Sequence, residues 1–180
     1  DLLIMALVHK SGLMYNIPLF SDFHSFEEIV NGYLRQFGKK LEEKQIRQIF
    51  KNEIFKNALV LFSLLEELRL YGDYDTLNLK IDMFANFSSA LDFIKLVFSR
   101  IDSDLSLFNN RGIGVGNILF LLTIARDGLS DDTIAKILNI PQIYVSSLLY
   151  KCHHFISVLG KINSISHSKI RNIITQIYKE

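Results

Sequence analysis

The sequence predicts a mainly α-helical protein, with a helical bundle followed by a winged-helix domain that carries a small β-hairpin. Three observations lead to this fold class. Only 2 Pro and 9 Gly interrupt 180 residues, which favours long helices. From Ser25 onward, apolar residues recur at the three- and four-residue spacing of amphipathic helices over most of the chain. Near the C-terminus the pattern changes to alternation on both sides of Gly160-Lys161, which predicts a hairpin.

The N-terminal segment is the part of the chain that the pattern defines least. Leu2 to Val8 is a continuous apolar run closed by Lys10-Ser11-Gly12. Such a run is typical of a buried strand or of a short buried helix, and periodicity does not choose between them. Because the chain begins with Asp1 and not with Met, we expect further sequence upstream of it.

Five helices are predicted in the first part of the chain. Ser25 is the expected N-cap of the first helix, and Gly38 follows its last apolar residue, where a left-handed C-cap is favoured. Gly72 is expected to end the third helix. The predicted helices are 25–37, one that carries Ile46 to Phe50, 57–71, 75–84 and one that runs from Ser88 or Ser89 to Ile101.

A glycine-rich stretch around residues 105–116 is interpreted as a linker between this helical unit and a second unit, 117–180. In the second unit, Asn117 to Arg126 reads as one helix, Ser130 as the N-cap of the next, and Pro141 as the start of a third. The hairpin and a last helix with four isoleucines follow. Three helices, a hairpin and a helix form a winged-helix arrangement with one C-terminal helix added.

Several kinds of site are excluded by residue types and spacing. The single cysteine, Cys152, rules out a disulfide framework within the chain and any CxxC metal site, and it suits a reducing, cytoplasmic setting. The five histidines lack the spacing of zinc ligands, so we expect no metal. Gly112, Gly114 and Gly116 lack the lysine of a phosphate loop. No apolar run has the roughly 20 residues that a membrane span needs, so no membrane partner is expected.

The charge distribution leaves DNA binding as an alternative function. The net charge of +1 excludes a uniformly basic nucleic-acid-binding surface. After Asp132, however, the only acidic residue is Glu180, which gives a local basic excess. The helix after Pro141 would be the recognition helix, and its only cation is Lys151 at the end. The alternative is therefore a winged-helix DNA-binding protein with an N-terminal helical dimerisation or ligand domain. The basic residues concerned are Lys136, Lys151, Lys161, Lys169, Arg171 and Lys179.

Several motifs in the right order resemble a known family. The segments "YLRQFGKKL" at 33–41, "NALVL" at 57–61 and "LLEELRLYG" at 64–72 resemble the helical lid of NACHT-type STAND ATPases. The subgroup around nephrocystin and the telomerase-associated protein is the most similar. "LLTIARDGLS" at 121–130 and "ISHSKIR" at 165–171 resemble the winged-helix domain that follows the lid in these proteins. The resemblance covers about residues 25–180.

The resemblance implies a nucleotide-gated signalling switch. In the family, an upstream NTPase core carries the Walker motifs, the lid closes over ADP or ATP, and the winged helix holds the autoinhibited form until the protein assembles. This chain would then be the regulatory part, 25–104 the lid and 117–180 the winged helix, with residues 1–24 holding the last strand of the core and a linker. The 180 residues contain no Walker A or Walker B motif, so the chain itself is not expected to be an enzyme.

Three residues receive roles through the resemblance. The histidine of the family's last motif contacts the β-phosphate, and here that position is His167. A helix N-terminus and an imidazole both favour a phosphate nearby. The family places a proline against the adenine, and here Ala58 stands at that position, after Asn57. The expected cofactor is ADP or ATP bound by the parent protein and not tightly by this part alone. The expected partners are the NTPase core and further copies of the protein on activation.

Overall fold

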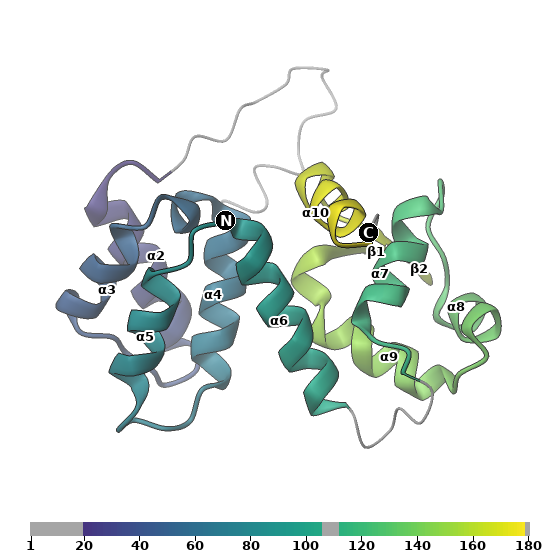
Figure 1. The fold of residues 1–180 in the computed structure, drawn as a ribbon, viewed down its shortest axis with the longest axis horizontal. Coiled ribbons are helices and arrows are strands. Elements are labelled where there is room, and N and C mark those ends of the chain that lie inside the picture. The colour runs from purple at the N-terminus through teal and green to yellow at the C-terminus, as the bar shows by residue number, and fades with distance from the viewer. Residues whose placement is uncertain (1–19, 106–111, 179–180) are drawn as a thin grey trace.

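The computed structural model describes residues 20–105 and 112–178, which are mainly helical with one small antiparallel hairpin near the C-terminus (Figure 1). The predicted fold class is confirmed. The prediction that residues 1–24 hold the last strand of a core concerns mostly residues 1–19, which lie outside the described residues. No described helix is long and apolar enough to cross a membrane.

The helical unit contains the first group of helices, and each predicted helix is present in it. They are α2 (Phe23–Arg35), α3 (Glu43–Phe50), the 3₁₀ helix η1 (Glu53–Lys56), α4 (Ala58–Leu70), α5 (Leu77–Ala85) and α6 (Ala90–Asp104).

Short polar residues set the ends of these helices. Helix α2 begins before the predicted start, because the Asp22 carboxylate accepts the backbone N–H of Ser25 at 2.7 Å. The prediction of Ser25 as N-cap was therefore wrong, and Ser25 lies inside the first turn. Ser89 caps α6 through the backbone N–H of Asp92, as one of the two predicted starts. Gly38 has the positive φ of 68° that the predicted C-cap requires.

Helices α2, α3, α5 and α6 contribute inward-facing apolar residues to the core of the helical unit, whereas α4 is buried on most of its faces. Phe26, Val30 and Leu34 face inward from α2 and are almost completely buried. Phe55, Phe84 and Phe93 come from three separate elements and meet edge to face. A fully buried side chain of this size stabilises the fold by roughly 1.5–3 kcal/mol. Residues that are far apart in the sequence therefore pack together because their helices turn apolar side chains toward one core.

The winged-helix unit has the element order expected from the sequence. Its hairpin pairs Leu159 with Ile162, so the turn is the two residues Gly160 and Lys161. Leu129 exchanges two backbone hydrogen bonds with Asn163 and so adds a minimal third strand. The elements are α7 (Val115–Ile124), α8 (Asp131–Leu138), α9 (Gln142–Lys151), the 3₁₀ helix η3 (His153–Phe155), β1 (Ile156–Leu159), β2 (Ile162–Ile165) and α10 (Ser168–Tyr178).

The glycines before and within α7 permit close packing. Helix α7 begins at Val115, two residues before the predicted Asn117, because Asp102 of α6 accepts the Val115 N–H at 2.6 Å. A Cβ added to Gly114 would collide with the Asp102 carboxylate, and one added to Gly116 would overlap the Tyr178 ring. The glycine-rich pattern that predicted a linker therefore marks, at these two positions, contacts of α7 with α6 and α10.

Helix α6 joins the two units. It packs against α4 of the helical unit and against α7 and α10 of the winged-helix unit, and Figure 1 shows it between the two groups. The Phe98 ring of α6 meets Phe155 of η3 edge to face, with ring centroids 5.7 Å apart. Buried apolar residues form a continuous cluster across both units. The surfaces that meet at α6 are called the junction below.

Candidate functional site at the junction

Four charged residues form a chain of ion pairs across the junction. Arg100 of α6 donates from Nε to both carboxylate oxygens of Glu67 of α4, at 2.7 and 2.8 Å. Its Nη1 donates to Asp104, and the Lys151 ammonium of α9 donates to the same Asp104 oxygen at 2.9 Å. The two units are thereby connected through Glu67, Arg100, Asp104 and Lys151, which we call the junction ion-pair chain.

The burial of Glu67 makes its ion pair with Arg100 important for the stability of the fold. The Glu67 side chain is 1% exposed, whereas the Arg100 side chain is 25% exposed. Removal from water raises the pKa of the Glu67 carboxyl, and the hydrogen bond and positive charge of Arg100 oppose that rise. A buried carboxylate without its guanidinium would be strongly destabilising, so this pair holds α4 and α6 in one arrangement.

Two neighbouring histidines of η3 lie on the winged-helix side of the junction in different environments. His153 is exposed, and its Nδ1 hydrogen-bonds to the Tyr150 carbonyl at 3.0 Å. Both ring nitrogens of His154 are buried and have no hydrogen-bond partner in the described part of the chain. Burial lowers the pKa of His154 to about 3, with smaller contributions from His153 and Arg100. His154 is therefore neutral at physiological pH.

A cavity of about 540 Å³ lies at the junction, in the size range of small-molecule pockets. Its wall comes from α4, α6, α9 and η3. We call it the junction cavity, and its lining residues are Glu66, Arg69, Leu70, Arg100, Leu105, Ser146, Ser147, Tyr150, Lys151 and His153.

The structure places the predicted phosphate contact, His167, at the N-terminus of α10. Its carbonyl accepts the Arg171 N–H and its Nδ1 accepts the Lys169 N–H at 3.2 Å, so it caps the helix. With Nδ1 accepting, the neutral ring carries its proton on Nε2, which leaves one donor for another group. The side chain is exposed, so a ligand can reach it.

The two residues predicted near adenine lie in the other unit. Asn57 is the N-cap residue of α4, but its side chain makes no capping bond, and its buried Oδ1 has no partner among the described residues. Ala58, the first residue of α4, is partly buried. In the part of the chain that is described, no hydrogen bond or ion pair joins His167 to Asn57 or Ala58.

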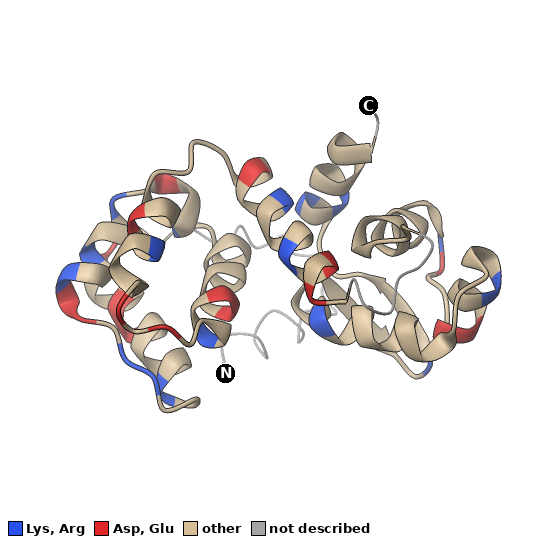
Figure 2. Ribbon diagram, turned by 60° about the horizontal axis from the view of Figure 1, so that its bottom comes forward, with Lys and Arg blue, Asp and Glu red and all other residues tan. Residues whose placement is uncertain are grey.

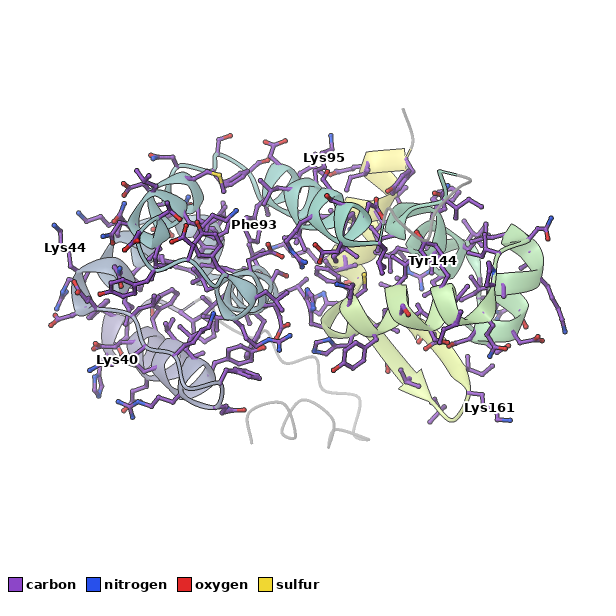
Figure 3. All side chains as sticks on the ribbon, turned by 90° about the horizontal axis from the view of Figure 1, so that it is seen from below. Lys40, Lys44, Phe93, Lys95, Tyr144 and Lys161 are labelled. Carbon is purple, nitrogen blue, oxygen red and sulfur yellow. The ribbon has the colours of Figure 1, made fainter. Side chains whose placement is uncertain are left out.

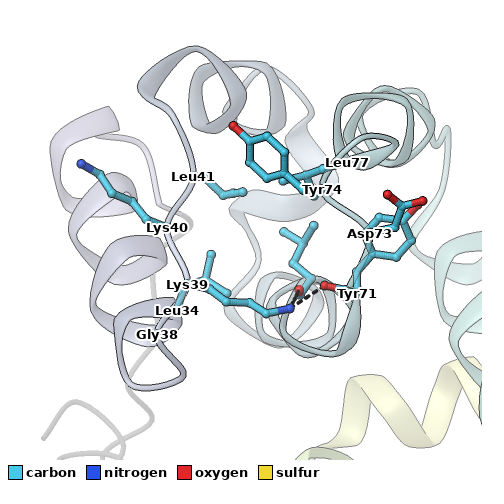
Figure 4. A pocket seen from close by; sticks show the side chains of 11 residues that line it. Leu34, Gly38, Lys39, Lys40, Leu41, Tyr71, Asp73, Tyr74 and Leu77 are labelled. Carbon is cyan, nitrogen blue, oxygen red and sulfur yellow. Dashed lines mark hydrogen bonds between the residues drawn. The ribbon is translucent and has the colours of Figure 1, made fainter.

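The motifs at 33–41 and 64–72 lie against each other. The Tyr33 hydroxyl donates to Glu66, and the Lys39 ammonium donates to the carbonyls of Leu68 and Tyr71 at the end of α4 (Figure 4). Burial lowers the pKa of Lys39. These contacts explain the two motifs as a structural unit, because Lys39 satisfies C-terminal carbonyls of α4. A cavity of about 320 Å³ opens beside Lys39, and Lys40 points away from it (Figure 4).

The face that would meet DNA in a winged helix carries apolar side chains here. Ile143 and Tyr150 of α9 are 75% and 79% exposed, and Val158 and Leu159 of the hairpin are 64% and 84% exposed. Figure 3 shows Lys161 at the hairpin tip.

Three of the six basic residues after Asp132 already have a partner. Lys136 pairs with Asp132, Lys151 with Asp104, and Arg171 donates to the Thr123 carbonyl. Figure 2 shows acidic and basic residues intermingled along the ribbon. Lys179 lies outside the described residues. The basic excess counted in the sequence therefore does not gather into one free positive surface over the described residues.

The remaining candidates for a reactive site are the single cysteine and possible metal ligands. Cys152 is buried, which raises the pKa of its thiol well above the usual range. Within residues 20–105 and 112–178, no group of three or more His, Cys, Asp or Glu side chains is placed to hold a metal ion.

Comparisons with family models, with curated proteins and with solved structures gave no match to this chain. The fold and the contacts described above are therefore the basis for assigning a function.

Proposed function

We propose that this chain is the regulatory part of a STAND-type signalling ATPase. The helical unit acts as a lid over ADP or ATP that is bound by an NTPase core in the same parent protein, and the winged-helix unit holds the inactive arrangement. The parent protein is cytoplasmic and forms homo-oligomers when nucleotide exchange releases this arrangement.

The observation that carries the proposal is the position of His167. It follows the hairpin of a winged helix directly, it caps the last helix, and its side chain is exposed. The Nε2–H donor and the N-terminus of α10 together favour a phosphate group. This is the role that the resemblance in the "ISHSKIR" segment assigns to it.

The contacts between the units support a lid that moves as one body with the winged helix. The junction ion-pair chain and the shared apolar core connect the units, so a force on one unit is transmitted to the other.

The DNA-binding alternative is less favoured by the geometry. Its proposed recognition helix, α9, exposes Gln142, Ile143 and Tyr150, and its one cation, Lys151, is paired with Asp104. Phosphate contacts normally come from free lysines and arginines.

The proposal is tested by purifying the protein together with the sequence encoded upstream of Asp1 and analysing its bound nucleotide. We expect ADP to co-purify in about equimolar amount and to be lost when residues 25–180 are deleted. A protein that carries no nucleotide in either form would overturn the proposal.

A further inference from the structure

The outer edge of strand β1 has backbone groups that the hairpin does not use. Asn163 of β2 exchanges two backbone hydrogen bonds with Leu129, at 2.9 Å each, so its N–H and C=O point away from β1. Val158 stands opposite Asn163 and therefore points its own N–H and C=O away from β2, because the two residues form a non-hydrogen-bonded pair. Among the described residues, β1 pairs only with β2. Its other edge is thus open to one more strand.

A cavity of about 840 Å³ lies between β1, α9 and the start of α8. The strand contributes Ile156 and Val158, which alternate along it and so face the same side. Helix α9 contributes Ser146, Leu149 and Tyr150, which share one face at a spacing of three and four residues. Val158 and Tyr150 are 64% and 79% exposed, so apolar surface is left uncovered beside the open edge. We call this cavity the strand groove.

The Asp131 carboxylate, which also lines the strand groove, is held by neutral groups only. It accepts hydrogen bonds from the Ser146 hydroxyl of α9 and, at 2.8 Å, from the side-chain amide of Asn163 of β2. In the part of the chain that is described, no lysine, arginine or histidine forms an ion pair with it. These contacts fix a carboxylate in the groove without a cation against it.

The other charged residues of the groove do not supply that cation. Asp132 pairs with Lys136 of the same helix. Lys161 borders the groove from the tip of the hairpin (Figure 3), and over the described residues it forms no ion pair with either aspartate. The strand groove therefore combines an open strand edge, apolar surface and a carboxylate that a positive charge from outside can reach.

We propose that the strand groove binds an extended peptide of a partner protein that carries a lysine or an arginine. The peptide adds a strand to β1 through hydrogen bonds to the N–H and C=O of Val158. Because side chains alternate across a strand, every second side chain of the peptide enters the groove. One of them is the basic residue, which pairs with Asp131, and an apolar one covers Val158 and Tyr150.

Two other occupants fit the strand groove less well. Duplex DNA would bring its phosphates against the Asp131 carboxylate. Strand β1 of a second copy has no basic residue between Ile156 and Leu159, so it would leave this carboxylate unpaired. The inference uses residues of the winged-helix unit alone and does not rest on an upstream NTPase core.

The test screens the 180-residue chain against a phage-displayed library of short random peptides. We expect the enriched peptides to share one lysine or arginine flanked by β-branched or aromatic residues. The best binder is synthesised with a fluorescent label, and anisotropy measures its affinity. The backbone amide signals of Val158 and Leu159 should shift when it binds.

Val158→Pro should weaken this peptide at least about tenfold, because it removes the N–H donor of the edge. Proline is tolerated on an edge strand where the N–H faces solvent. Val158→Thr is the matched control, since it keeps a β-branched side chain and the N–H, and its affinity should stay within about threefold of wild type. An N-methyl group on the peptide amide that pairs with Val158 tests the same contact without altering the protein.

Asp131→Asn should also weaken the peptide at least about tenfold, because it removes the charge that the basic residue meets. Asp82→Asn is its control. Asp82 likewise accepts a hydrogen bond from a neutral side chain, that of Gln48, but it lies on α5, away from the groove. The two variants change the net charge equally, so a general charge effect would weaken both alike.

The inference fails if no peptide is enriched, if the enriched peptides lack a basic residue, or if the N-methylated peptide binds as tightly as the unmodified one. It also fails if the chain forms a concentration-dependent dimer that Val158→Pro abolishes, because the edge then pairs with a second copy. None of these results bears on the nucleotide contact proposed for His167.

Discussion

The guanidinium of Arg100 donates from one nitrogen to both carboxylate oxygens of Glu67, a residue 33 positions earlier in the chain. Because Glu67 is buried, this contact fixes α6 on α4, and through Asp104 and Lys151 it also holds α9. These ion pairs add to the apolar core, including the Phe98–Phe155 contact, that holds the helical and winged-helix units together.

We expect Arg100→Gln to lower the free energy of unfolding by about 3 kcal/mol, because it leaves the Glu67 carboxylate buried without a cation. Without Arg100 the pKa of Glu67 rises further above 4.5, so the native state holds a proton that the unfolded state releases. The loss should therefore be smaller at about pH 5 than at neutral pH. Urea unfolding at both pH values measures it.

The double variant Arg100→Gln, Glu67→Gln is the control for this effect. It removes both charges, so we expect most of the lost stability to return. If the double variant is as unstable as Arg100→Gln alone at neutral pH, the burial of an unpaired charge is not the cause.

His154 should make the protein sensitive to acid. Its pKa of about 3 in the folded state lies below the ordinary value of 6.5, so the unfolded state binds a proton that the native state does not. This contribution is present above about pH 6.5 and is lost as the pH falls toward 3, with roughly 2 kcal/mol lost at pH 5. In His154→Phe, which keeps an aromatic ring beside Phe155, the loss should be absent. If the wild-type protein and His154→Phe lose the same amount of stability as the pH falls, His154 is not the cause of the acid sensitivity.

The close packing of α7 on α10 is tested at Gly116. Gly116→Ala should destabilise the fold by about 1–3 kcal/mol, because the added methyl group would displace the Tyr178 ring. Gly32, within α2, has no atom near the position of an added Cβ, so Gly32→Ala should stabilise by about 0.5–1 kcal/mol. Thermal unfolding compares the two substitutions, and a loss of stability of the same size in both would contradict the packing explanation.

The apolar face of α9 and the hairpin predicts that the chain does not bind duplex DNA. Fluorescence anisotropy at low salt is the direct measurement, since electrostatic binding is strongest there. We expect no binding. Binding that weakens steeply with rising salt would instead favour the DNA-binding alternative.

The local features of the fold were largely predictable from the sequence, whereas the contacts between distant segments were not. Periodicity located the helices, and Gly160-Lys161 located the hairpin turn, because these depend on neighbouring residues. The start of α2 was misplaced since Asp22 and Ser25 are both good N-caps and only the three-dimensional structure distinguishes them. Gly114 and Gly116 indicated a linker, because the Asp102 and Tyr178 side chains that they accommodate are distant in sequence.

The candidate site was predictable only in part. The family resemblance singled out His167, Asn57 and Ala58 by their positions in the matching motifs. Glu66 and Glu67 are adjacent in the sequence, and both side chains are buried and paired with arginines. Ion pairs that join α4, α6 and α9 depend on tertiary packing, so no spacing in the sequence indicates them.

The proposed function requires that His167 contacts a bound phosphate when this chain closes over a nucleotide. The measurement is the rate at which ADP dissociates from the proposed parent protein, compared between wild type, His167→Ala and the exposed-histidine control His24→Ala. Loss of one charge-assisted hydrogen bond should speed dissociation at least about tenfold in His167→Ala and leave the control unchanged. Equal rates for all three proteins would show that His167 does not contact the phosphate.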